Sequence, residues 1–154
     1  MWMRGVEEIR RRAVPVLEKR EEVLVAYLFG SAAEGRPHGK SDVDLAILVD
    51  QKAYEERGKT EPFGYEAALT AELMAALATD HVDIVLLHKA PPLLAHEVIA
   101  HGVLLFSRDE EARHAFEVAT KLRYLDTKPL REIQRLYLYE RTKRGEFSKL
   151  PNPW

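Results

Sequence analysis

The sequence predicts a single domain of the α/β (α+β) class over residues 1–154, with about four strands flanked by helices. Four short runs rich in Val, Leu and Ile have the length and composition of strands. Amphipathic stretches with helical periodicity lie before, between and after these runs. A chain of 154 residues, with 46% hydrophobic and 31% charged residues, is large enough to bury one core.

The predicted strands are apolar runs that end at Gly, Pro, Asp or His residues. The first run ends at a Gly-Ser pair, and the next two each contain aspartate among apolar neighbours. The fourth is short and follows Gly102. We expect strands over residues 22–29, 42–49, 81–88 and 103–106.

The predicted helices have apolar residues at helical spacing, and several begin at proline. Residues 51–59 are polar and predict a linker with at most one helical turn. Residues 109–145 predict a C-terminal helical segment, either a hairpin or one helix kinked at Pro129. We expect helices over residues 4–20, 62–78, 91–100, 109–124 and 129–144.

A Gly30-Ser31 pair follows the first predicted strand. Gly and Ser are frequent in ordinary turns, so the pair alone favours a plain turn. In the alternative, the backbone amides of Gly30 and Ser31, with the Ser31 hydroxyl, hold nucleotide phosphates. A helix that starts at Ser31 or Ala32 would then present free N–H groups to the anion.

Asp42 and Asp44 lie two residues apart at the start of the second predicted strand. Side chains alternate along a strand, so both carboxylates point to the same side. Two carboxylates on one face of an apolar strand repel each other and lose hydration. A divalent cation is the simplest compensation, and Mg²⁺ prefers such oxygen ligands together with substrate phosphates.

Gly30-Ser31, ten intervening residues and Asp42-Val43-Asp44 together resemble the G-S-x₁₀-D-x-D motif of the polymerase-β-like nucleotidyltransferase superfamily. The short length resembles its minimal nucleotidyltransferases (MNT proteins), many of which are antitoxins paired with a HEPN-domain ribonuclease toxin. The resemblance implies a mixed sheet flanked by helices and two Mg²⁺ ions bound to carboxylates. It also implies transfer of a nucleoside monophosphate from ATP to a hydroxyl.

The superfamily has a third acidic residue on a later strand, and Asp83 in the apolar run 81–87 is the candidate. The alternative, Asp80, precedes the strand and matches the family position less well. In the implied site Asp42 and Asp44 bind both metal ions. Asp83 binds metal, or deprotonates or orients the attacking hydroxyl.

The resemblance implies AMP transfer to a tyrosine of a cognate HEPN toxin, in a hetero-oligomer with that toxin. Two alternatives stay open. One is transfer to a small-molecule hydroxyl, as in antibiotic modification, with a homodimer completing the acceptor pocket. The other is a non-catalytic antitoxin that acts by binding alone. Because only a helical segment follows the last predicted strand, we expect the acceptor site to be completed by a second copy, by another protein or by very little.

Composition excludes several other classes of protein. The net charge of −2 argues against a general nucleic-acid-binding surface, which would be strongly basic. The absence of cysteine excludes disulfides and thiolate catalysis. No apolar run approaches the roughly 20 residues of a membrane span, and the N-terminus does not read as a signal peptide. We therefore expect a cytoplasmic protein.

Three weaker signals have a plain alternative. The basic loop residues Arg36, His38 and Lys40 either contact the triphosphate or belong to a solvated hairpin. Glu34 stands where many members of the superfamily carry a basic residue, which argues against a phosphate contact from that position. Arg108-x₅-His114 formally matches the Arg-x₄₋₆-His motif of HEPN ribonucleases, which we interpret as coincidence. An aromatic and basic C-terminal stretch predicts either a docking face or an ordinary amphipathic helix. That stretch comprises Tyr124, Arg131, Arg135, Leu136, Tyr137, Tyr139, Arg141, Lys143 and Arg144.

Overall fold

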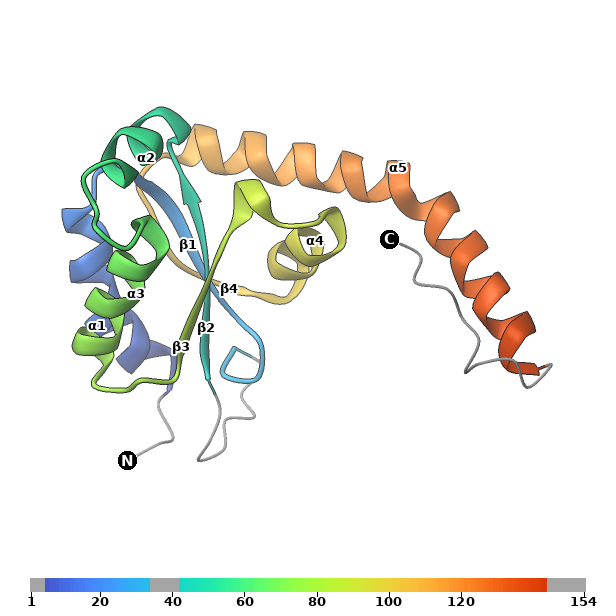
Figure 1. The fold of residues 1–154 in the computed structure, drawn as a ribbon, viewed down its shortest axis with the longest axis horizontal. Coiled ribbons are helices and arrows are strands. Elements are labelled where there is room, and N and C mark those ends of the chain that lie inside the picture. The colour runs from blue at the N-terminus through green and yellow to red at the C-terminus, as the bar shows by residue number, and fades with distance from the viewer. Residues whose placement is uncertain (1–4, 34–41, 144–154) are drawn as a thin grey trace.

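The computed structural model describes residues 5–33 and 42–143, which form one four-stranded sheet with helices on both faces (Figure 1). The strands are β1 (Val23–Phe29), β2 (Val43–Val49), β3 (Val82–Leu86) and β4 (Val103–Ser107). Their order is β3-β2-β1-β4. β1 is antiparallel to β2 and β4, whereas β3 is parallel to β2. The predicted mixed sheet of four strands is confirmed.

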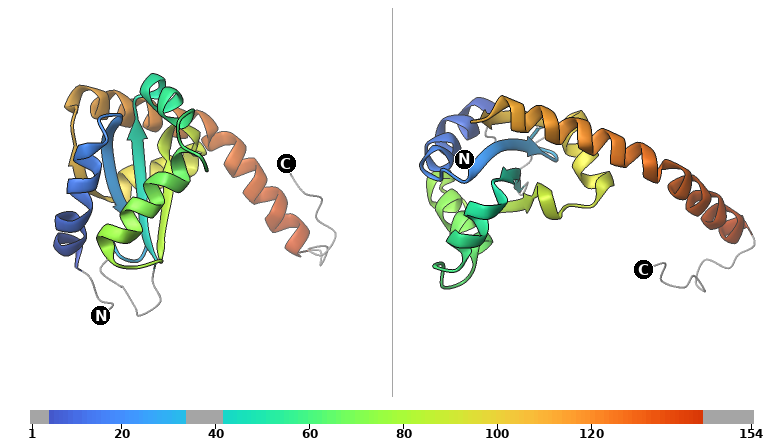
Figure 2. Two further views of the ribbon diagram at one scale, coloured as in Figure 1. Left: turned by 60° about the vertical axis from the view of Figure 1, so that its left-hand side comes forward. Right: turned by 90° about the horizontal axis from the view of Figure 1, so that it is seen from above.

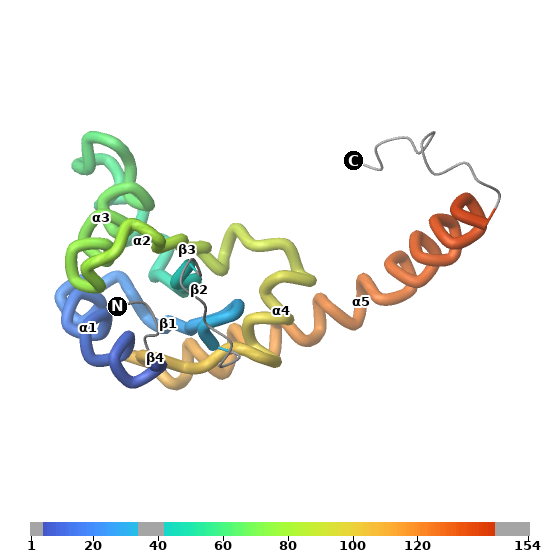
Figure 3. Tube along the Cα trace, turned by 90° about the horizontal axis from the view of Figure 1, so that it is seen from below, coloured from blue at the N-terminus to red at the C-terminus, as the bar shows by residue number. Residues whose placement is uncertain are grey.

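Helices cover both faces of this sheet (Figure 3). α1 and α3 lie on one face, while α4 and the first part of α5 lie on the other. Seen from above, α5 crosses this second face and extends well beyond the sheet (Figure 2). The helices are α1 (Val6–Lys19), α2 (Gln51–Gly58), α3 (Tyr65–Leu77), α4 (Pro92–His101) and α5 (Glu110–Lys143).

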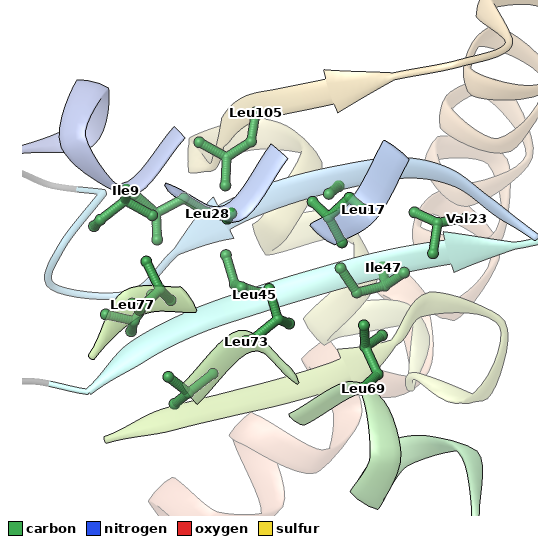
Figure 4. Packing of buried hydrophobic residues seen from close by; sticks show 14 of the residues in the cluster. Ile9, Leu17, Val23, Leu28, Leu45, Ile47, Leu69, Leu73, Leu77 and Leu105 are labelled. Carbon is green, nitrogen blue, oxygen red and sulfur yellow. The ribbon is translucent and has the colours of Figure 1, made fainter. Parts of the chain in front are cut away.

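The main core lies between the sheet and helices α1 and α3 (Figure 4). Apolar side chains at a spacing of four residues give each helix one buried stripe. Alternate residues of the strands meet these stripes, and burial of this apolar surface is the main force that holds the layers together. The labelled members are Ile9, Leu17, Val23, Leu28, Leu45, Ile47, Leu69, Leu73, Leu77 and Leu105.

A second core lies between the sheet and α4 and includes Tyr27, Ala46 and Val98. Because Val43 and Leu45 face the first core, strand alternation turns Asp44 toward the α4 side. The fold therefore separates a fully packed face from the face that carries the motif carboxylate.

Two predicted element boundaries are wrong. Residues 51–59, expected as a linker, form the helix α2, whose Tyr54 ring packs edge-on against Tyr65 with centroids 4.9 Å apart. The Tyr54 hydroxyl donates to Glu66 at 3.1 Å, so tertiary contacts stabilise a helix that lacks an apolar face of its own. α3 begins at Tyr65 and not at residue 62, because Gly64 has a φ of +92° that a helix does not admit.

The C-terminal segment is one helix of 34 residues, not a hairpin. It continues through Pro129, and its ribbon bends along its length (Figure 1). Proline removes one helical hydrogen bond, which favours such a bend. The carbonyl of Tyr124, five residues before Pro129, accepts hydrogen bonds from the side chains of Thr127 and Arg131, both at 3.0 Å. The kinked-helix alternative is therefore correct.

No helix within residues 5–33 or 42–143 is long and apolar enough to cross a membrane.

A buried ionic cluster links the end of α1 to α2 and α3, at the end of the sheet where β1 begins. The Arg20 side chain is only 2% exposed and donates to Glu72 at 2.7 and 2.9 Å. Its Nη1 lies 3.7 Å from the carboxylate of Glu22, which also accepts from Tyr65 at 2.7 Å and from Arg57 at 3.0 Å. Each buried charge thus has several partners, as buried charges require.

Replacement of Arg20 by alanine is expected to lower the free energy of unfolding by about 3–5 kcal/mol, because the buried Glu22 carboxylate would lose one of its two counter-ions and Glu72 would lose its bidentate partner. Urea denaturation measures this loss. Arg12→Ala is the matched control, since Arg12 pairs with Glu8 at 3.1 Å on the surface. We expect that change to cost less than about 1 kcal/mol. Equal losses in the two variants would contradict the assigned role of the cluster.

Candidate active site

The Gly30-Ser31 pair forms a tight turn at the end of β1. Gly30 has a φ of +76°, in the left-handed region that glycine favours, and its carbonyl accepts from Ala33 N at 3.2 Å. A Cβ placed on Gly30 would collide with the Asp44 carboxylate. The turn and Asp44 are therefore in direct contact. Residues 31–33 are a turn, so a helix that starts at Ser31 or Ala32 is not seen within the described residues.

The sheet register brings two of the predicted carboxylates together. Asp44 in β2 lies directly opposite Asp83 in the parallel strand β3, and opposite Phe29 in β1. Neighbouring strands are about 4.8 Å apart, so the two carboxylates are close neighbours. Both lie on the α4 side, because Asp83 stands between two residues, Val82 and Ile84, of the opposite core.

The third predicted carboxylate, Asp42, lies one residue before β2 and is exposed. Its Oδ1 is 3.4 Å from Nδ1 of His81, the residue that precedes β3. The His81 carbonyl accepts from Val43 N at 2.7 Å and holds the two strand starts together. Asp80 is 88% exposed and contacts His81 at 3.5 Å. The register thus places Asp83, and not Asp80, beside Asp44.

Burial and like charges raise the pKa of Asp44 from its ordinary value of 3.8 to about 6. Loss of hydration is the largest cause, followed by repulsion from Asp83 and then from Asp42. Asp83 itself is exposed, since β3 is an edge strand of the described sheet; the expectation of a buried strand around it is wrong. The cluster therefore has one partly buried carboxylate with two more exposed ones beside it.

The chemistry of this cluster fits a hard divalent cation. Carboxylate oxygens are ligands that Mg²⁺ prefers, and a cation would relieve the repulsion that raises the pKa of Asp44. Within residues 5–33 and 42–143, no group of three or more His, Cys, Asp or Glu side chains is close enough to hold a metal ion by itself. An open site of this kind leaves coordination positions for substrate phosphates and water, as Mg²⁺ sites commonly do.

Comparison with known proteins places this arrangement in a family. The family model described as "Polymerase beta, Nucleotidyltransferase" matches residues 12–111, which include the turn, all three aspartates and the whole sheet. The chain belongs to this nucleotidyltransferase family. The family resemblance expected from the Gly30 to Asp44 motif is confirmed.

Relatives of this nucleotidyltransferase include the protein adenylyltransferase MntA of Aphanizomenon flos-aquae, 27% identical over 131 residues that cover 84% of this chain and 87% of that protein. A chain in the crystal structure of a toxin–antitoxin with AMP-PNP is 24% identical, with a TM-score of 0.55 over 92% of this chain and 98% of that one. A chain in the structure of tri-AMPylated Shewanella oneidensis HEPN toxin with MNT antitoxin is 21% identical. Its TM-score is 0.51, over 94% and 98% of the two chains. Both structural likenesses establish the fold.

The pKa of Asp44 predicts how the stability of the metal-free nucleotidyltransferase depends on pH. The folded protein holds the Asp44 proton up to a pH of about 6, whereas the unfolded chain releases it near 3.8. Stability should therefore fall as pH rises through this window and be constant above it, as far as Asp44 contributes. Thermal unfolding in chelator from pH 4 to pH 7, compared with Asp44→Asn, measures the contribution. Parallel curves for the two proteins would contradict it.

Several residues singled out in the sequence have other roles or cannot be placed. Arg108 donates to the carbonyls of Val23, Leu17 and Glu18 at 2.9–3.1 Å, so it closes the end of α1. This supports the interpretation of its spacing to His114 as coincidence. The loop residues singled out, Glu34, Arg36, His38 and Lys40, lie outside the described residues, as does Arg144 at the end of the C-terminal stretch.

Two residues beside the turn were missed in the sequence. Glu97 and His101 at the end of α4 line a pocket with Phe29 and Gly30. The His101 Nδ1 donates to Glu97 at 3.1 Å, four residues back along the helix. In the sequence, the only signal for this pair is that Glu97 and His101 are four residues apart, just before Gly102. Only the packing of α4 on the sheet brings the pair to Gly30.

Proposed function

We propose that this nucleotidyltransferase transfers AMP from ATP to a tyrosine hydroxyl of a cognate HEPN-domain toxin, and so acts as its antitoxin. The observation that carries the proposal is the position of Asp44, in contact with the Gly30 turn on one side and opposite Asp83 on the other. A phosphate held at the turn thereby meets the carboxylates. The naming of the MntA relative as a protein adenylyltransferase supports AMP as the group transferred.

Each motif residue has a distinct part in the proposed reaction. The N–H groups at Gly30 and Ser31, with the Ser31 hydroxyl, bind the phosphates of ATP. Asp42 and Asp44 hold two Mg²⁺ ions, with Asp83 as a further ligand. When bound, these ions neutralise charge on the attacking and leaving oxygens of an in-line displacement. Asp83, which is exposed, orients the acceptor hydroxyl or takes its proton, and pyrophosphate leaves.

The exposed surface of α5 supports a protein as the acceptor. Along much of its length this helix carries large apolar side chains that are 42–65% exposed. A surface of this kind is typical of sites that bind another protein. A hetero-oligomer with the toxin would cover it and would bring the acceptor tyrosine to the carboxylates. The residues are Val118, Leu122, Leu125, Leu130, Ile133, Leu136, Tyr137, Leu138 and Tyr139.

Transfer of label from the α-phosphate of ATP tests the proposal. Purified protein, Mg²⁺ and labelled ATP are added to a lysate of the source cells, with the Asp44→Asn protein as the control. One labelled protein band, absent from the control, is the expected result. Pyrophosphate without a labelled protein would favour a small-molecule acceptor. Neither product would favour an antitoxin that acts by binding alone.

A further inference from the structure

The outer edge of β3 has no partner strand within residues 5–33 and 42–143, where the strand order is β3-β2-β1-β4. Figure 3 shows β3 at the margin of the sheet, with α3 on one side of it and α4 on the other. Asp83 on this strand is exposed, and Ile84 and Val85 are only partly buried. The edge is therefore accessible to a further strand.

Every second residue of β3 directs its backbone groups to this open edge. The His81 carbonyl accepts from Val43 N at 2.7 Å, so it points to β2. Neighbouring residues along a strand direct their N–H and C=O groups to opposite sides, and Asp83 and Val85 therefore also bond to β2. The residues between them present a row of donors and acceptors with which an extended peptide can pair. These outward residues are Val82, Ile84 and Leu86.

The order of the site across the sheet places the acceptor at the same edge. The Gly30 turn, which is proposed to hold the phosphates, contacts Asp44 at the end of β1. Asp83 lies on the other side of Asp44, in β3. In an in-line displacement the attacking and leaving oxygens lie on opposite sides of the phosphorus. Because pyrophosphate leaves on the side of the turn, the acceptor hydroxyl approaches from the side of β3.

We propose that the acceptor protein binds by β-strand addition: an extended segment pairs with the outer edge of β3 and carries the acceptor tyrosine beside Asp83. The inference rests on the proposed function, because it takes the acceptor to be a protein tyrosine. Side chains opposite each other on neighbouring strands have Cβ atoms about 4.5–5.5 Å apart. A tyrosine opposite Asp83 points to the α4 side, as Asp83 does, and its hydroxyl can donate to the carboxylate.

A second copy of this chain fits the edge less well than a tyrosine-bearing segment. Two copies related by a two-fold axis would place their β3 strands side by side and antiparallel. Both Asp83 carboxylates would then lie on the same face of one continuous sheet, where like charges repel. The side chain of a tyrosine is neutral and brings no such repulsion.

Hydrogen–deuterium exchange at single-residue resolution tests this pairing. The complex of this chain with the HEPN-domain protein is prepared with Mg²⁺ and α,β-methylene ATP, which cannot transfer AMP. We expect the Ile84 amide to exchange at least about tenfold more slowly in the complex than in the free chain, because it gains a partner. The Val85 amide bonds to β2 in both states, so its exchange rate should change much less.

Ile84→Pro removes the same outward N–H group and places a ring at the edge, but it breaks no bond to β2. We expect the KM for the HEPN-domain protein to rise at least about tenfold, while the affinity for α,β-methylene ATP stays at the wild-type value. Ile84→Ala is the matched control. It loses the side chain that packs against the core but keeps the N–H, so its KM should change less than about threefold.

The outcomes separate this inference from the proposed function. A HEPN-domain protein that receives no AMP from the wild-type chain overturns both. Transfer without slower exchange at Ile84, or with equal KM changes in the proline and alanine variants, overturns the inference alone. Slower exchange that requires only a higher concentration of this chain would assign the edge to a second copy, and also overturns it. If Ile84→Pro does not fold, the exchange measurement on the wild-type complex decides.

Discussion

Asp44→Asn is expected to lower AMP transfer by about a thousandfold or more, while the protein stays folded. Asp44 is the motif carboxylate in contact with the Gly30 turn and opposite Asp83. Its side chain therefore lies between the turn that is proposed to bind phosphate and the carboxylate of Asp83. Asparagine has nearly the same size as aspartate but lacks the negative charge that would hold the cation. Initial rates of label transfer measure the loss, and thermal unfolding at pH 7 shows whether the fold is intact.

The same substitution should make the metal-free protein more stable at neutral pH. Ionised Asp44 is repelled by Asp83 and Asp42, which is why its pKa is raised to about 6. Asp80→Asn is the matched control, because Asp80 is a neighbouring aspartate that is 88% exposed. We expect that variant to keep both wild-type activity and wild-type stability. Full transfer by Asp44→Asn, or equal loss in Asp80→Asn, would contradict the assignment of Asp44.

Gly30→Ala is expected to abolish transfer and to destabilise the protein. At a φ of +76° an L-residue is strained by roughly 1–2 kcal/mol. In addition, the new methyl group would collide with the Asp44 carboxylate and displace it from its place beside the turn. The loss of activity should therefore exceed what the loss of stability explains. Transfer rates at a temperature well below the unfolding midpoint measure the difference.

Gly64→Ala separates the two effects. Gly64 also has a positive φ, +92°, but a Cβ placed there meets no atom within 4 Å. We expect a similar loss of stability from backbone strain, with transfer retained. If both variants lose activity to the same extent, backbone strain alone accounts for the effect of Gly30→Ala, and the contact with Asp44 has no special role.

The sequence predicted the strands and the carboxylate pair well because both are local patterns. Asp42 and Asp44 stand out as charges in an apolar strand, and β1 and β2 are flanked by clear turn residues. Asp83 was preferred over Asp80 by a motif position, whereas in the structure the parallel register with β2 sets it beside Asp44. The register between strands that are far apart in sequence is not a local property. The neighbours of Asp83 could therefore not be derived from periodicity.

Features that depend on tertiary contacts were missed for the same reason. The polar segment of α2 gains its stability from Tyr54 on Tyr65, residues from two different helices. Glu97 resembles any exposed glutamate until α4 packs on the sheet and sets it beside Gly30. The exposure of Asp83 follows from the position of β3 at the edge of the sheet. Each of these needs the arrangement of elements, which a single sequence does not contain.

The most direct test of the central claim is the intact mass of the HEPN-domain protein after co-expression with this chain. We predict that the wild-type chain adds a whole number of AMP units, that peptide mapping places them on tyrosine, and that Asp44→Asn adds none. An unmodified HEPN protein that is still neutralised, equally well by wild type and by Asp44→Asn, would contradict the account. Inhibition would then come from binding alone.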